Sequence, residues 1–210
     1  MKIAFIYDAI YPFTKGGVEK RIFELAKCLS KKHEVYIIGL KCWTKENLLK
    51  CGNIIYYGTA PMVKFYTKDR RSIGEGVYFA VSIVKALKFI AKEGINIIDV
   101  QNAPYLHYPI IYLAKKLKLL SEAKIVITWH EVWSKYWLEY LGKVKGYIGY
   151  VVEKIVAKFS ENSIAVSKRT QHMLHSLGVK EVALIPNGVN FELIQSIPPS
   201  KKYQSDIVYA

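Results

Sequence analysis

Short apolar runs alternate with amphipathic stretches from one end of the chain to the other. Runs of this length, without strict internal alternation, are typical of strands that are buried on both faces of a parallel sheet. The predicted strands cover residues 3–7, 35–39, 54–58, 97–100, 125–128, 164–166 and 182–185.

Helical periodicity fills several of the intervals between these runs. Val18, Ile22 and Leu29 lie on one face of a predicted helix that extends from residue 18 to about residue 31. A second apolar face joins positions 148, 152, 155 and 159, and the lengths of 77–92 and 108–118 favour helix. This alternation predicts the α/β class, with a Rossmann-like, doubly wound and mainly parallel sheet.

Two segments interrupt the alternation. Residues 60–75 form a predicted loop with four basic side chains, Lys64, Lys68, Arg70 and Arg71. Further on, two consecutive prolines in 197–202 prevent a helix from continuing and predict an extended linker. A new apolar run then begins at residue 206.

Composition favours a folded and strongly basic domain, because 51% of the residues are apolar and the formal net charge is +14. Such a charge indicates attraction to phosphate, but an acidic partner domain or a solvated lysine surface explains it equally well. The N-terminus lacks a signal-peptide layout, and the longest uncharged run, 100–114, is too short for a membrane span. Cys28, Cys42 and Cys51 form no close pair, so free thiols in a reducing cytoplasm are expected.

Polar candidates follow the predicted strands, at the carboxyl edge where open α/β sheets bind ligands. They are Gly16, Gly17, Asn102, His130, Ser167 and Asn187. This convergence predicts a binding site at that edge.

The paired glycines Gly16 and Gly17 precede a predicted helix. Glycine permits close backbone approach, and a helix start offers free N–H groups to a diphosphate, although an ordinary glycine-rich turn explains the pair as well. The dinucleotide fingerprint G-x-G-x-x-G is absent after the first strand. Glu19 and Arg21 are expected either to pair with each other or to contact a ligand.

An aromatic and basic segment follows His130. Its members are Trp133, Lys135, Tyr136, Trp137, Tyr140, Lys143 and Lys145. On a helix they suit an anionic lipid surface, stacking on a sugar ring or stacking on single-stranded nucleic acid. Packing of the rings inside the domain, with the lysines outside, is the alternative.

Several short sequences together resemble one enzyme family. They are Lys2-Ile-Ala-Phe-Ile-Tyr7, Gly16-Gly-Val-Glu-Lys20, Ala165-Val-Ser167 and Ile185-Pro-Asn-Gly-Val-Asn190. This pattern, which extends over nearly the whole chain, resembles the N-terminal domain of GT4 retaining glycosyltransferases, whose fold is GT-B. The chain departs from the pattern at Asn190, where the family usually has Asp, and at Asp99 and Gln101, where many relatives have His.

The resemblance implies roles for individual residues. It makes His130 the catalytic candidate, as a hydrogen-bonding partner of the transferred sugar, although a lone histidine is more often structural. The implied donor-binding residues are Gly16, Gly17, Asn187 and Gly188. The implied acceptor-binding residues are Glu19, Gln101, Asn102 and Glu131, and Asp99 is equally well explained as structural.

The resemblance also implies a domain plan and a reaction. Residues 1–193 would be the acceptor-side domain, 194–204 the linker, and 205–210 the start of a C-terminal nucleotide-sugar domain. The complete enzyme would transfer a sugar from a nucleoside diphosphate sugar to an acceptor hydroxyl with retention, with no metal or other cofactor, while this half alone would be inactive. The acceptor would be a carbohydrate or a lipid-linked molecule, met in the cytoplasm or at the inner face of the membrane.

Two other functions are compatible with the sequence. One is a non-enzymatic basic α/β module that binds anionic membrane or nucleic acid, and the other is a different GT-B enzyme acting on nucleotide sugars. The first explains the charge but not the placement of Gly16, Gly17 and His130, and for the transferase no nucleic-acid partner is expected. No Ser-His-Asp or Cys-His arrangement and no paired carboxylates indicate a hydrolase.

Overall fold

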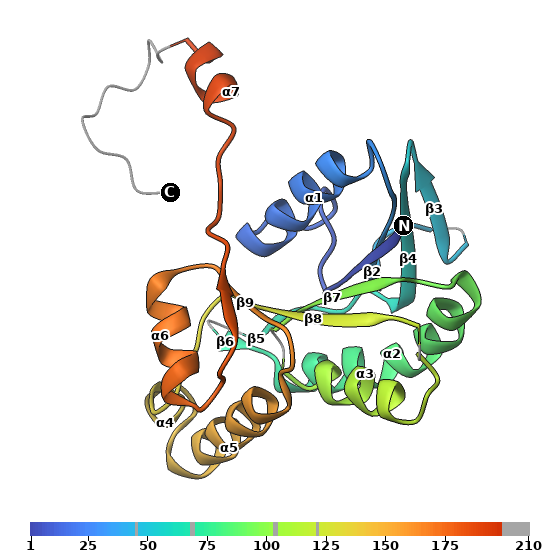
Figure 1. Cartoon of the computed structure of the whole chain (residues 1–210). Coiled ribbons are helices and arrows are strands. Elements are labelled where there is room, and N and C mark those ends of the chain that lie inside the picture. Colours follow the sequence, from blue (N-terminus) through green and yellow to red (C-terminus); the bar gives the residue numbers. More distant parts are fainter. Residues whose placement is uncertain (45, 68–69, 103–104, 121, 199–210) are drawn as a thin grey trace.

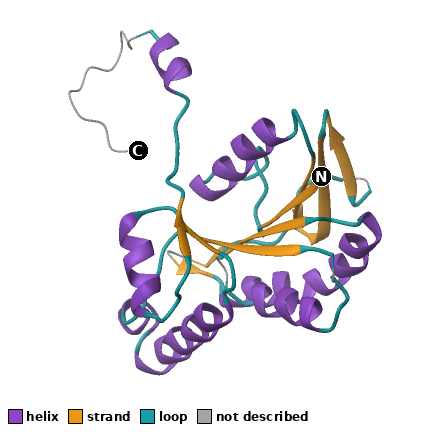
Figure 2. Cartoon of the chain, viewed as in Figure 1, coloured by secondary structure: helices purple, strands orange, loops and turns teal. Residues whose placement is uncertain are grey.

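The structure is a computed structural model that describes residues 1–198 apart from 45, 68–69, 103–104 and 121. Its centre is an eight-stranded sheet in the order β10-β9-β8-β7-β1-β2-β4-β3 (Figures 1 and 2). Neighbouring strands are parallel except β3 and β4, which pair antiparallel. The strands are β1 (Lys2–Ile6), β2 (Glu34–Lys41), β3 (Leu48–Cys51), β4 (Ile54–Pro61), β7 (Ile97–Gln101), β8 (Lys124–Trp129), β9 (Ser163–Ala165) and β10 (Val182–Leu184).

Helices cover both faces of this sheet. They are α1 (Gly17–Leu29), α2 (Ile73–Glu93), α3 (His107–Lys116), α4 (Tyr136–Leu141), α5 (Lys143–Phe159), α6 (Lys168–Ser176) and α7 (Phe191–Ser196). Helix α1 lies on one face, while α2, α3 and α5 lie on the other (Figure 1). The predicted fold class is therefore confirmed, and every predicted strand is present with ends shifted by a few residues.

The basic loop predicted at 60–75 is wrong in part. Its first two residues end β4, and a short hairpin of β5 (Tyr66–Thr67) and β6 (Arg70–Arg71) follows. Helix α2 begins at Ile73 because Ser72 caps it, its Oγ accepting the N–H of Glu75 at 3.4 Å. The Ser-x-x-Glu capping signal that marks this helix start is visible in the sequence. Lys64 is exposed in the remaining loop, and Lys68 lies outside the described residues.

The C-terminal expectations are only partly covered by the described residues. Helix α7 spans Phe191–Ser196, so the expected boundary between residues 193 and 194 falls inside a helix. Most of the expected linker and the whole expected strand at 205–210 lie outside the described residues.

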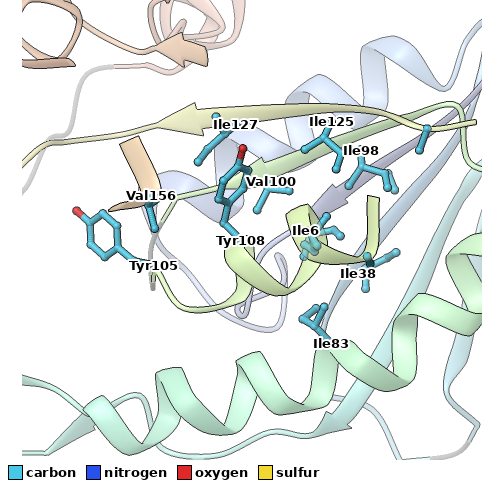
Figure 3. Close-up of a cluster of buried hydrophobic side chains, with 14 of the residues drawn as sticks. Ile6, Ile38, Ile83, Ile98, Val100, Tyr105, Tyr108, Ile125, Ile127 and Val156 are labelled. Atoms are coloured by element: carbon cyan, nitrogen blue, oxygen red, sulfur yellow. The ribbon is translucent and has the colours of Figure 1, made fainter. Parts of the chain in front are cut away.

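The larger of two apolar cores fills the space between the sheet and helices α2, α3 and α5 (Figure 3). Ile6, Ile38 and Val100 from the strands meet Ile83 from α2, and all four are fully buried. Each such side chain contributes roughly 1.5–3 kcal/mol by leaving water. A smaller core joins α1 to the opposite face through Ile22 and Ala26. Both faces of the central strands are thus buried, which explains their continuous apolar runs.

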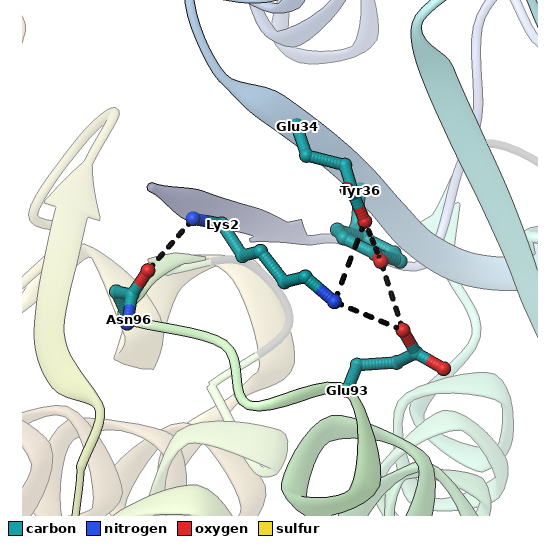
Figure 4. A network of polar contacts seen from close by, with 5 residues as sticks. All are labelled: Lys2, Glu34, Tyr36, Glu93 and Asn96. Atoms are coloured by element: carbon teal, nitrogen blue, oxygen red, sulfur yellow. Dashed lines mark hydrogen bonds and ion pairs between the residues drawn. The ribbon is translucent and has the colours of Figure 1, made fainter.

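A polar network fixes the amino-terminal edge of the sheet (Figure 4). The Tyr36 hydroxyl donates to Glu34 and, over 3.0 Å, to Glu93, while the Lys2 ammonium lies 3.6 Å from Glu34 and 3.4 Å from Glu93. The Lys2 backbone N–H donates to Asn96 at 2.8 Å. Burial, followed by these two carboxylates, raises the pKa of Tyr36. The network connects β1, β2 and the end of α2. It lies at the opposite end of the strands from their carboxyl edge.

Two smaller expectations can also be compared with the structure. Cys28, Cys42 and Cys51 are free thiols, as predicted. Among the described residues, no helix has both the length and the apolar character needed to cross a bilayer.

Candidate functional site

His130 lies directly after β8 and faces the side of the sheet that α1 covers. Successive strand residues point to opposite faces, and Ile97 of β7 packs in the core beneath α1. Asp99 and Gln101 therefore share that face with Thr128 and His130. The His130 Nε2 is 2.9 Å from the Oε1 of Gln101, and the Thr128 hydroxyl donates to Asp99 at 2.7 Å.

These contacts define the tautomer of His130. An amide oxygen only accepts hydrogen bonds, so the proton must be on Nε2 of His130. The same orientation of the Gln101 amide is favoured by the Asp99 carboxylate on this face, because the amide N–H₂ group lowers the pKa of Asp99. Within the described residues Nδ1 makes no hydrogen bond, which leaves its lone pair available to a ligand hydroxyl.

Burial and charge keep the imidazole neutral. Burial, followed by the positive charge of Arg21, lowers the pKa of His130 to about 4. Burial also raises the pKa of Asp99 to about 6, against the hydrogen bonds from Thr128 and Gln101 and the charge of Arg21. At neutral pH the imidazole of His130 is thus neutral, and the carboxylate of Asp99 is largely ionised.

We expect NMR of histidine-labelled protein to show a neutral His130 protonated at Nε2 down to about pH 5, because its folded pKa lies well below the usual value. The pH dependence of stability has the matching sign. The unfolded chain takes up this proton first, so the contribution of His130 to stability falls as the pH drops from 6.5 toward 4. A His130 that titrates near 6.5, or that is protonated at Nδ1, would contradict the assignment.

Arg21 connects α1 to the segment that follows β10. Its guanidinium donates to Asn187 Oδ1 at 3.1 Å and to the carbonyl oxygens of Pro186 and Ile185 at 3.4 and 3.5 Å. Burial lowers the pKa of Arg21, and the charge of Asp99 opposes this. From the sequence, Arg21 was expected either to form an ion pair with Glu19 or to contact a ligand. The structure instead brings Arg21, Asn187 and the start of α1 together at the carboxyl edge.

The paired glycines form the start of α1. Gly16 is the N-cap in extended backbone, and a Cβ there would lie 2.4 Å from the Glu19 carboxylate, which folds back over it. Around Gly17 a Cβ would meet nothing within 4 Å, so its surroundings are open. Glu19 is 8% exposed. A diphosphate at this helix start would therefore have free access beside Gly17 but would meet a carboxylate beside Gly16.

A hollow of about 660 Å³ opens beside His130. Its lining residues are His130, Glu131, Val132, Trp133, Tyr136, Tyr140, Ser167, Arg169, Thr170 and Met173. The indole of Trp133 packs against Tyr136 and Tyr140, with ring centroids 5.4 and 4.7 Å away. One wall is thus aromatic, while Glu131, His130 and Arg169 supply polar groups. Such a combination suits a carbohydrate, whose ring stacks and whose hydroxyls form hydrogen bonds.

The remaining predicted residues are divided between surface and interior. Gln101 and Asn102 are 1% and 0% exposed, and as consecutive residues they point to opposite faces. Gln101 reaches His130, whereas the Asn102 side chain has no hydrogen-bond partner among the described residues. Asn187 and Gly188 are exposed beyond β10, and Glu131 is exposed at the hollow. The structure thus brings Gln101, His130 and Glu131 together and leaves Asn102 beneath the surface.

Glu153 is a structural residue of the site that sequence reasoning missed. Its carboxylate is fully buried and accepts the backbone N–H groups of Trp133 at 2.8 Å and Ser134 at 2.6 Å, and the Tyr105 hydroxyl at 3.1 Å. It thereby fixes the segment that carries the aromatic wall. The sequence signal for this role was the position of Glu153 next to Val152 and Val156 on the apolar side of the predicted helix. An acid buried there requires hydrogen-bond donors from elsewhere in the fold.

Trp137 packs inside the domain, which was the alternative considered for the rings of the aromatic segment. Its ring lies 5.5 Å from that of Tyr105, and a Cβ at Gly149 would come within 2.7 Å of it. Trp133 is also only partly exposed, and Tyr136 is 51% exposed. The segment therefore packs inside the domain in part and lines the hollow in part.

A second hollow, of about 740 Å³, lies at the opposite edge of the sheet. Met1, Lys2, Glu34 and Asn96 line it, next to the network of Figure 4. Ligands of open α/β sheets bind at the carboxyl ends of strands, so the hollow beside His130 is the better candidate despite its smaller volume. Across the described part of the chain, no group of three His, Cys, Asp or Glu is placed to hold a metal ion. Metal independence stays a prediction.

Comparison with known proteins identifies the class and then the family. The E. coli structure described as "Trehalose-6-phosphate … bound with UDP-2-fluoro glucose" has a TM-score of 0.53 and 12% identity over 84% of this chain and 42% of its own. The α,α-trehalose 6-phosphate synthase of Burkholderia multivorans has a TM-score of 0.51 and 10% identity over 83% of this chain and 41% of its own. The fold is thus that of GT-B glycosyltransferases, and this chain spans about two fifths of those structures.

The family assignment rests on the sequence model of Glycosyltransferase Family 4, which matches residues 15–193. The chain belongs to this family, which confirms the resemblance seen in its sequence. No curated protein matches the chain.

Proposed function

We propose that this domain is the acceptor-side half of a retaining glycosyltransferase, which transfers a sugar from a nucleoside diphosphate sugar to an acceptor hydroxyl. One observation supports this most directly: a neutral His130, with Nδ1 available, lines an open hollow at the carboxyl edge of the sheet. Membership of Glycosyltransferase Family 4 supports sugar transfer, and the UDP-2-fluoro glucose named for the E. coli structure supports a nucleotide-sugar donor.

His130 would contact the transferred sugar. Its Nδ1 accepts a hydrogen bond from a sugar hydroxyl, while Gln101 holds the ring orientation through Nε2. Because the imidazole stays neutral, this contact needs no proton transfer at neutral pH. The hydrogen bond acts in catalysis to the extent that it strengthens as the sugar gains positive charge in the transition state.

The start of α1 would contribute to binding of the diphosphate. The open surroundings of Gly17 admit a ligand to free N–H groups, and the helix dipole favours negative charge there. The leaving diphosphate, on the same face of the sugar, would accept the proton of the acceptor hydroxyl. This domain then provides no general base, and electrostatic stabilisation is its main contribution.

The acceptor would occupy the hollow beside His130. Trp133, Tyr136 and Tyr140 offer a stacking wall, while Glu131 and Arg169 offer polar contacts at its rim. These groups suit a carbohydrate, either free or carried by a lipid.

The complete protein that carries this domain should release a nucleoside diphosphate when given its donor and acceptor. A panel of donors, scored by nucleoside diphosphate release and followed by NMR of the product anomer, tests this. A product of inverted configuration would reject the retaining mechanism. Conversion of the nucleotide sugar without transfer would instead favour another GT-B enzyme acting on nucleotide sugars.

Residues 1–210 alone should fold but show no turnover. The two apolar cores provide an interior of their own, whereas the nucleotide-binding groups of the family belong to the other domain. Circular dichroism and a cooperative unfolding transition check folding, and donor turnover checks activity. Sugar transfer by purified 1–210 would refute this division of roles.

A further inference from the structure

The helices on one side of the sheet expose many large apolar side chains. On α2 these are Ile73, Val77, Tyr78, Val81 and Val84, which are 37–62% exposed. On α5 they are Val144, Tyr147, Ile148, Ile155 and Phe159, which are 42–77% exposed. Leu113 of α3 and the following Leu117 and Leu119 add to them. Monomeric proteins rarely leave apolar surface of this extent without a partner.

The charged residues exposed on the same helices are all lysines. They are Lys85, Lys88, Lys92, Lys116, Lys143, Lys145, Lys154 and Lys158. The acids of these helices are unavailable at the surface, because Glu75 and Glu153 are buried and Glu93 is held by Lys2 and Tyr36. Glu161, just beyond α5, pairs with Lys116 at 2.9 Å.

These three helices form one layer. They lie together on the side of the sheet opposite α1 (Figure 1), and their inner faces pack into the larger apolar core. Their exposed residues therefore face away from the sheet. We define this outward surface of α2, α3 and α5, with the turn to Leu119, as the lysine-apolar face.

We propose that the lysine-apolar face docks on the surface of an anionic lipid bilayer. Helices that lie in a membrane interface have this composition, because apolar side chains insert while lysine stems extend toward the headgroups. A second copy of the same face is a poorer occupant, since it would oppose lysines with lysines. An anionic bilayer satisfies both the apolar residues and the positive charge.

This surface shares only Lys143 and Lys145 with the aromatic and basic segment that the sequence indicated. In that segment the structure packs Trp137 inside and uses Trp133 to line the hollow. The inference is independent of the proposed catalytic function, because it rests on another face of the molecule. A failed donor screen would leave it standing, and failed vesicle binding would leave the transferase proposal standing.

Vesicle co-sedimentation of residues 1–210 tests the proposal. The protein should bind vesicles that contain phosphatidylcholine and phosphatidylserine, and should not bind phosphatidylcholine alone. Each lysine near an anionic surface contributes on the order of 1 kcal/mol, so the triple variant Lys85→Gln, Lys88→Gln and Lys92→Gln should bind roughly 100-fold more weakly. Binding should also weaken as salt rises.

A matched control removes the same charge elsewhere. Lys31, Lys32 and Lys50 are exposed at the amino-terminal edge of the sheet, outside the lysine-apolar face. Changing all three to Gln should lower affinity by no more than a few fold. Equal loss in both triple variants would overturn the proposal, because it would show attraction to net charge alone.

A second variant examines the apolar contribution. Val77→Ser, Val81→Ser and Val84→Ser change side chains that are already about half exposed, so the fold should persist by circular dichroism. These changes should weaken vesicle binding and remove the part that survives high salt. Unchanged binding, equal binding to neutral vesicles, or a dimer in solution that these changes dissociate would each overturn the proposal.

Discussion

Replacing His130 by alanine should lower kcat of the complete transferase by roughly 30- to 1,000-fold. The change removes one hydrogen bond to the transferred sugar, which is worth roughly 2–4 kcal/mol when it acts in the transition state. KM for the donor should change less, because most donor contacts are expected in the other domain. Steady-state kinetics with the identified donor and acceptor measure both quantities.

The control for this experiment is His172→Ala, which removes an exposed histidine from α6. It should leave both kinetic constants unchanged. Gln101→Ala separates contact from positioning, since it keeps the imidazole but frees Nε2. It should reduce kcat less than His130→Ala does and should raise the pKa of His130 toward its usual value by admitting water. Wild-type kcat in folded His130→Ala would make this histidine structural.

The order of secondary structure was predictable from the sequence because it depends on local patterns. Strands buried on both faces, such as β1 and β8, produce apolar runs, and the helices that follow these two strands restore polar positions. The antiparallel β3 was missed because a four-residue edge strand with one partner has mostly exposed side chains and no apolar run. The start of α2 was missed for a different reason, since its capping residues were read as loop.

The contacts within the site were less predictable than its location. The rule for open sheets placed Gly17, His130 and Asn187 at one edge, but it gave no information about which side chains meet there. The hydrogen bond between Arg21 and Asn187 joins residues that are 166 positions apart. It depends on β10 ending beside the start of α1, which follows from the strand order and the path of the chain beyond it.

The separation of Gln101 from Asn102 illustrates the same limit. In the sequence they are neighbours of the same chemical kind, and both became acceptor-binding candidates. A strand directs consecutive side chains to opposite faces, so only the face beneath α1 brings one of them to His130. The face to which Gln101 points is set by the packing of Ile97 and Ile98 into different cores. This packing is a property of the tertiary structure and is not visible in the local sequence.

We expect Glu153→Gln to lower the free energy of unfolding of residues 1–210 by roughly 1–3 kcal/mol, the cost of a buried donor that is left without a partner. Glutamine has nearly the same shape, but it replaces one acceptor oxygen by an N–H₂ group. That group would face the backbone N–H of Trp133 or Ser134, and a buried donor would lose its partner. Urea unfolding followed by tryptophan fluorescence measures the change.

Glu161→Gln is the matched control, because it makes the same substitution where the carboxylate is 59% exposed and pairs with Lys116 at 2.9 Å. Its cost should be no more than about 1 kcal/mol, as for other exposed ion pairs. Similar costs for the two variants would show that the Glu153 hydrogen bonds contribute little beyond a surface ion pair. If the Glu153 hydrogen bonds do hold the segment that carries Trp133, the aromatic wall of the hollow loses its anchor in Glu153→Gln. The folded variant should then bind the acceptor more weakly than the wild type, under conditions in which most of the variant is still folded.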